Sequence, residues 1–187
     1  MGWLADERGL EKCAANYVPL TPLSYLDRAV AVYRHELAVV YGPHRKTYAE
    51  YHARVSQLAS ALVGLGVKPG DVVALFAENG PRWLVADQGL MGAGAADAVR
   101  GASAPVDELL YILRDSGAVG LVVESRELLQ QLALESAALA GLRFVACDVV
   151  RWHHVTVQAR PTATQTQAAL FEEVMSATQE DRRSDRA

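Results

Sequence analysis

The chain has 187 residues, of which 51% are hydrophobic and 21% are charged, and its net charge is −4. This balance is typical of a globular domain with a buried core and excludes an extended disordered chain. An acidic protein whose arginines are scattered along the sequence is not built to bind nucleic acid or an anionic membrane through its charge. No run of the sequence approaches the ~18 apolar residues that a transmembrane segment requires.

The first third of the chain predicts two helices and a hairpin. Thr21 and Pro22 suit the start of a helix, because threonine caps the first turn and proline needs no hydrogen-bond partner there. In chain order the patterns predict a helix from Thr21 through Tyr33, strands over residues 37–41 and 46–48 around a turn at 42–45, and an amphipathic helix over 49–63.

The middle of the chain alternates apolar strands with helices. Residues 72–77 are apolar on both faces, which is typical of a strand inside a parallel sheet. Asn79 stands where a cap for the next helix is expected. The alternation predicts an α/β fold with an open, mostly parallel sheet built of βαβ units. The remaining predicted elements are helices over 81–91, 105–114 and 127–139, and strands over 95–99, 118–123 and 142–149.

The character of the sequence changes after Val150. No convincing period follows, apart from a short helical pattern at residues 171–176, and the charge-rich end predicts disorder. We therefore divide the chain into an irregular segment at residues 1–20, one domain at 21–150, and a divergent, partly disordered tail at 151–187.

Three stretches resemble one family. The entry segment from Asn16 to Ala29 is similar to the N-terminus of plant-type acyl-activating enzymes, which are adenylate-forming, AMP-binding ligases. The helix, turn and strand from Leu58 to Ala74 resemble a feature of the whole superfamily. The most specific stretch runs from Glu78 to Leu113. Its Asp87-Gln88 pair and its strand end at Asp97 to Arg100 resemble the long-chain fatty acyl–acyl carrier protein synthetases of cyanobacteria and plastids.

The resemblance implies a fold and an activity. Residues 21–150 would form part of the N-terminal subdomain of such an enzyme. The family activates a fatty acid with ATP and Mg²⁺ as an acyl-adenylate, then passes the acyl group to the thiol of acyl carrier protein or coenzyme A. The two cysteines are isolated and the N-terminus carries acidic residues without an apolar run, which together predict a cytoplasmic protein. A plastid is the alternative that the resemblance allows.

The parts of the family that perform adenylation have no counterpart in this sequence. No lysine occurs after Lys68, and the threonine-rich residues 162–166 contain no glycine with which to wrap a phosphate. We therefore expect no catalytic residue and no cofactor-binding residue here, with ATP and Mg²⁺ bound only by full-length members. The interpretation is a truncated ligase that is inactive alone and exposes a sheet edge and apolar surface.

Two alternatives remain open. A non-catalytic binding module for acyl carrier protein or for a full-length partner would fold as a monomer and bind the carrier specifically. A small flavodoxin-like nucleotide-binding protein fits the alternating strands and helices, but the sequence lacks its glycine-rich phosphate loop.

Asp97 and Arg100 are the candidate substrate-binding residues. They end a predicted strand, and ligands of open α/β sheets bind beyond the carboxyl ends of the strands. The competing interpretation is a structural ion pair between these two neighbours or with Asp87. His153 and His154 are adjacent, so on a strand they would point to opposite faces, and no metal site is predicted.

Overall fold

The computed structural model describes residues 11–13, 17–134, 137–147 and 157–159. The chain divides into two compact units, Met1–His52 and Ala53–Ala187, and each is described by itself. Over the described ranges, none of the helices combines the length and the apolar character that crossing a bilayer would take. The predicted irregular start, the helix at 171–176 and the disordered end fall largely or wholly outside these ranges.

The first unit contains a capped helix and a hairpin. Helix α1 (Pro22–Tyr33) begins at Thr21 as predicted, because the Ser24 amide donates to Thr21 Oγ1 at 3.1 Å and the Thr21 amide donates to Ser24 Oγ at 2.9 Å. Strands β1 (Leu37–Tyr41) and β2 (His44–Thr47) pair antiparallel. Strand β2 begins earlier than predicted, since Tyr41 pairs with His44 across a two-residue turn in which Gly42 has φ +54°.

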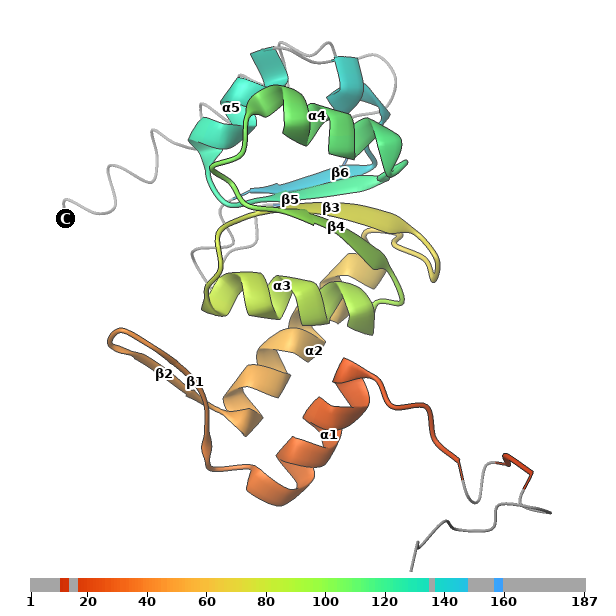
Figure 1. Cartoon of the computed structure of the whole chain (residues 1–187), viewed down its shortest axis with the longest axis vertical. Coiled ribbons are helices and arrows are strands. Elements are labelled where there is room, and N and C mark those ends of the chain that lie inside the picture. The colour runs from red at the N-terminus through yellow and green to blue at the C-terminus, as the bar shows by residue number, and fades with distance from the viewer. Residues whose placement is uncertain (1–10, 14–16, 135–136, 148–156, 160–187) are drawn as a thin grey trace, which may run out of the picture. The chain divides into compact units, whose positions relative to one another are not determined.

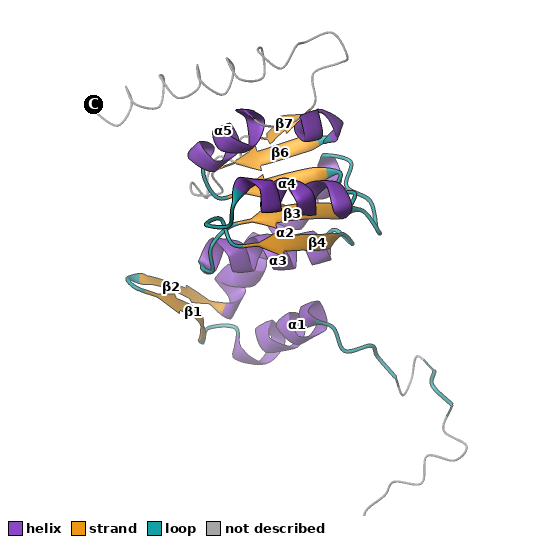
Figure 2. Cartoon of the chain, turned by 45° about the horizontal axis from the view of Figure 1, so that its top comes forward, coloured by secondary structure: helices purple, strands orange, loops and turns teal. Residues whose placement is uncertain are grey.

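The second unit is built on one five-stranded sheet in the order β4-β3-β5-β6-β7 (Figures 1 and 2). Strands β3 to β6 run parallel, and β7 pairs antiparallel with β6. The predicted α/β fold with an open, mostly parallel sheet is confirmed. The strands are β3 (Val72–Phe76), β4 (Ala96–Arg100), β5 (Gly120–Val123), β6 (Phe144–Cys147) and β7 (Val157–Ala159).

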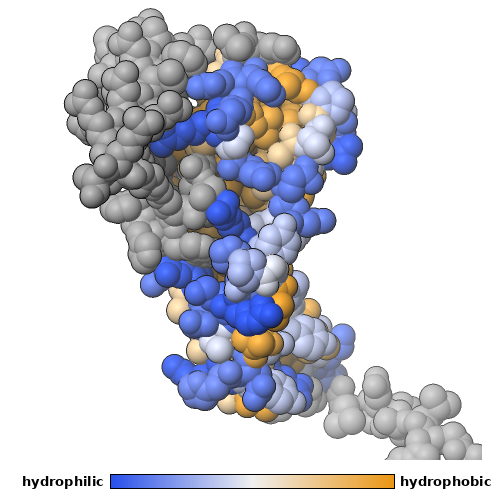
Figure 3. Space-filling model, turned by 90° about the vertical axis from the view of Figure 1, so that its left-hand side faces the viewer, coloured by the Kyte–Doolittle hydropathy of each residue, from blue (hydrophilic) through white to orange (hydrophobic). Residues whose placement is uncertain are grey.

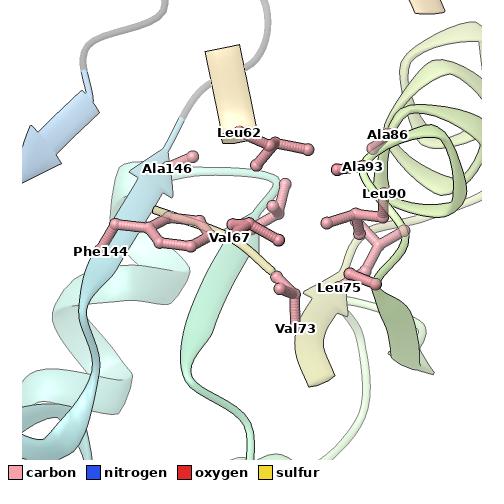
Figure 4. Packing of buried hydrophobic residues seen from close by; sticks show 11 residues of the cluster. Leu62, Val67, Val73, Leu75, Ala86, Leu90, Ala93, Phe144 and Ala146 are labelled. Atoms are coloured by element: carbon pink, nitrogen blue, oxygen red, sulfur yellow. The ribbon is translucent and has the colours of Figure 1, made fainter. Parts of the chain in front are cut away.

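Helices cover both faces of this sheet. Helix α3 lies on one face and helices α4 and α5 lie on the other (Figure 1). The core on the α3 face also receives Leu62 from α2, and Figure 4 shows its side chains converging with Phe144. The helices are α2 (Tyr48–Gly64), α3 (Pro81–Gly92), α4 (Val106–Asp115) and α5 (Arg126–Leu134), followed by a 3₁₀ helix, η1 (Ala137–Gly141).

Two glycines in α3 let it approach α2 closely. A Cβ atom at Gly89 would lie 2.8 Å from Leu58 Cδ2, and one at Gly92 would lie 3.1 Å from Ala59 Cβ. Glycine lowers helix propensity, so its presence at both positions is explained by the close approach that the missing Cβ atoms permit.

Three details differ from the sequence predictions. The helix predicted over 127–139 ends at Leu134, and the tighter 3₁₀ turn after it lets Leu139 and Leu142 pack under α4 and α5. Asn79 does not cap α3; Gly80 is the N-cap, in extended conformation and without a side-chain cap bond. Strand β7 lies in the stretch where the sequence shows no period. It was not predicted, because three residues are too few to show alternation.

Arg143 joins the start of β6 to the turn that precedes β3. Its Nη2 lies 2.7 Å from Asp71 Oδ1, and its Nη1 donates to the Gly66 carbonyl oxygen at 2.7 Å. The Lys68 amide donates to the other Asp71 oxygen, Oδ2, at 2.7 Å. Arg143, followed by this amide, holds the pKa of Asp71 below its ordinary value.

We expect Arg143→Met to raise the pKa of Asp71 towards its ordinary value of 3.8. A lowered pKa in the folded state gives stability that is present above the unfolded pKa and lost as the pH falls through the folded one. The wild type should therefore lose more unfolding free energy than the variant on acidification below pH ~4. Carboxyl NMR and urea unfolding measure both effects. An unchanged Asp71 titration, or the same result for the exposed Arg28→Met control, would contradict the assignment.

Candidate functional site

The carboxyl ends of β3, β4 and β5 form the place where an open sheet of this order binds ligands. The chain runs from β3 to β4 on one side and from β5 to β6 on the other, so the connections diverge between β3 and β5 and leave a switch point there. The segments that meet at this edge are residues 77–80 after β3, 101–105 after β4 and 124–125 after β5.

Glu78 ties these three segments together. Its Oε1 accepts a hydrogen bond from the Ser103 amide at 2.9 Å, and its own amide donates to Glu124 Oε2 at 2.7 Å. Gly101 allows the close approach, because a Cβ atom there would lie 3.3 Å from Glu78 Oε1. The Ser103 backbone amide, more than any other group, lowers the pKa of Glu78, so this carboxylate is ionised at neutral pH.

Arg100 is already paired within this edge. Its Nε donates to Glu108 Oε1 at 2.6 Å, and this carboxylate raises the pKa of Arg100. Asp97 lies elsewhere: it is in register with Val73, in the core under α3, whereas Arg100 is in register with Phe76, in the core under α4. The structure therefore places the two candidate residues on opposite faces of β4, and their role in substrate binding stays a prediction.

The described carboxyl edge carries more negative than positive charge. The Arg100 guanidinium is committed to Glu108 and also feels the charge of Glu78, while Glu124 accepts a hydrogen bond from the Glu78 amide. An incoming phosphate would therefore meet mostly negative charge. Within the part of the chain that the structure describes, no three His, Cys, Asp or Glu side chains gather where they could hold a metal ion. His153 and His154 lie outside the described residues.

Two features of this region were not predicted from the sequence. Glu78 and Glu124 each follow an apolar strand directly, and that position alone could have identified them. Asp97 meets the carboxyl of Asp87 on α3. The competing interpretation from the sequence was an ion pair between Asp97 and Arg100. Burial, and then the hydrogen bond with Asp97, raises the pKa of Asp87 to about 6.

The fold and its order of elements are those of the N-terminal subdomain of adenylate-forming enzymes. The N-terminal subdomain of NpsA from Klebsiella oxytoca is similar over 73% of this chain and 34% of its own, with a TM-score of 0.58 and 20% identity. The structure of MbtA from Mycobacterium smegmatis is similar over 76% of this chain and 27% of its own, with a TM-score of 0.62 and 31% identity.

The chain belongs to the AMP-binding enzyme family, whose model matches residues 26–185. A chloroplastic long-chain fatty acid–acyl carrier protein ligase from Arabidopsis thaliana is 42% identical over 103 residues, which are 55% of this chain and 14% of the ligase. The chain thus spans about one seventh of the length of this curated relative. The family match continues past Val150, and the division proposed at that residue stays a prediction.

Proposed function

We propose that the chain supplies the N-terminal part of a ligase that activates a fatty acid with ATP and transfers it to the thiol of acyl carrier protein or coenzyme A. The observation that carries the proposal is the 42% identity over 103 residues to the long-chain fatty acid–acyl carrier protein ligase. Residues 26–185 also match the AMP-binding enzyme family.

The exposed apolar side chains of the first unit support the proposal that this chain is part of a larger protein and packs against the rest of it. Leu37, Val40 and Tyr41 of the hairpin strand β1 are each more than half exposed. An isolated two-stranded hairpin is at best marginally stable in water. Figure 3 shows hydrophobic residues at the surface among hydrophilic ones. Such a surface suits burial by the remaining length of a ligase.

We further propose that the chain alone does not form an acyl-adenylate. Adenylation requires backbone amides and cations around the phosphates of ATP. The described carboxyl edge presents Glu78 and Glu124, and its Arg100 is committed to Glu108. The sequence contains no lysine after Lys68.

ATP–pyrophosphate exchange on the purified chain tests this proposal. With a panel of fatty acids we expect no exchange above the background without acid, whereas a full-length acyl carrier protein ligase assayed in parallel should exchange. Exchange that depends on the fatty acid would overturn the proposed inactivity. Specific binding of acyl carrier protein without exchange would favour a binding module over a part of a ligase.

For the compartment we propose a plastid, in place of the cytoplasm that the sequence alone predicts. The relative that matches over 103 residues is named as chloroplastic. A fluorescent fusion of the gene's whole product, imaged in the source cells, separates the two: diffuse fluorescence outside plastids would reject the proposal.

A further inference from the structure

Two carboxyl groups meet between helix α3 and the edge strand β4. Asp97 stands in register with Val73, whose side chain belongs to the core under α3, so Asp97 lies on the α3 face of the sheet. Asp87 lies on α3, and the two carboxyls are joined by a side-chain hydrogen bond. Both side chains are partly buried. A hydrogen bond between two carboxyls requires that one of them keeps its proton.

The surroundings of the pair favour the protonated form. Gln88 Nε2 donates to Asp87 Oδ2 at 3.1 Å, and Gln88, 9% exposed, is the one buried polar residue of the described core. Burial first, and Asp97 second, raises the pKa of Asp87 to about 6. Two adjacent carboxylates in a partly buried place repel each other, so the pair resists losing its last proton.

The charged groups on the elements packed around this pair are bound elsewhere or lie on other faces. Strand β3 carries none between Val72 and Phe76. Arg54 on α2, the helix that approaches α3, donates to Gln57 Oε1 at 3.1 Å. On α3 itself, Arg82 stands five residues before Asp87 and so on another side of the helix. Arg100 of β4 lies on the opposite face of the sheet, bound to Glu108 of α4.

We propose that Asp87 and Asp97 share one proton and make the packing of α3 on the edge strand β4 sensitive to pH. With the proton held, the carboxyls form a hydrogen bond that ties the helix to the strand. When both are ionised, their repulsion loosens the same contact. Strand β4 ends the sheet within the described residues, so it has only β3 to hold it on its other side.

The direction of the pH dependence follows from the raised pKa. A carboxyl whose pKa is about 6 in the folded state and 3.8 ordinarily binds its proton more tightly when folded. Its contribution to stability is fully present below the unfolded pKa and is lost as the pH rises through about 6. The sheet unit therefore loses this contribution between about pH 4 and pH 7.

Urea unfolding of the 187-residue chain and its Asp97→Asn variant from pH 4 to pH 7.5 tests the proposal. The asparagine amide can donate to the Asp87 carboxylate without a shared proton. We expect the unfolding constant of the wild type, divided by that of the variant, to rise about tenfold over this range, after allowing for solvent screening of a partly exposed pair. Asp87→Asn should give the same result.

The exposed Asp115→Asn on α4 is the matched control, and its ratio should stay flat with pH. Carboxyl NMR on the wild type gives a second measurement that needs no variant to fold: Asp87 should titrate near pH 6. In Asp97→Asn its pKa should fall, but stay above its ordinary value, because burial still raises it. Parallel unfolding curves for wild type and variant, or an Asp87 that titrates normally in the wild type, would overturn the shared proton.

Discussion

Replacing Gly120 by alanine is expected to destabilise the sheet unit by about 3 kcal/mol, at the upper end for overpacking. Gly120 of β5 stands in register with Phe144 of β6, and the phenyl ring lies across the glycine. A Cβ atom at Gly120 would be 2.3 Å from Phe144 Cζ. The ring cannot move away easily, because it is buried in the core on the α3 face together with Leu62 and Val67 (Figure 4).

Urea unfolding followed by circular dichroism measures this loss, and two further variants show its cause. Gly141→Ala is the control, because a Cβ atom there meets nothing within 4 Å, and its effect should stay within about 0.5 kcal/mol. Phe144→Leu removes the ring, so the double variant should cost less than the sum of the two single ones. Additive effects would show that the ring and the new methyl group do not collide.

The sequence predicts the sheet well because each buried strand carries its own signal. The residues of β3 are apolar without alternation, and the structure places β3 between two parallel strands, β4 and β5. The start of α1 was also predictable, because its cap depends on neighbouring residues: Thr21 and Ser24 are three residues apart. The 3₁₀ helix η1, where an α-helix was predicted, has no such local signal, because its packing depends on where Leu139 and Leu142 lie in the core.

The candidate site was less predictable, because it depends on contacts between residues far apart in the chain. The strand period does place Asp97 and Arg100 on opposite faces, but it does not show what each one meets. The link from Glu78 to Glu124 joins residues 46 positions apart, and no spacing rule reveals it. The pairing of Asp87 with Asp97 also required the packing of α3 on β4.

Phe76→Ala is expected to cost about 4 kcal/mol of unfolding free energy, through lost burial and the cavity left behind. Phe76 is 0% exposed at the end of β3, which lies between β4 and β5, and packs in the core under α4 and α5 with Leu109 and Leu132. A domain has only about 5–15 kcal/mol to lose, so this one change should shift the urea midpoint strongly.

The matched control for Phe76→Ala is Tyr111→Ala, an aromatic residue of α4 that is 60% exposed, and it should change stability by no more than about 0.5 kcal/mol. If Phe76→Ala cost less than about 1.5 kcal/mol, the core under α4 and α5 would have to collapse around the missing ring. Slowed amide exchange in β3 and β5 of the wild type, lost in the variant, would locate the damage at the centre of the sheet. Glu78 lies two residues after Phe76. Loosening of the end of β3 would therefore also release the hydrogen bonds of Glu78 that join the three loops at the carboxyl edge.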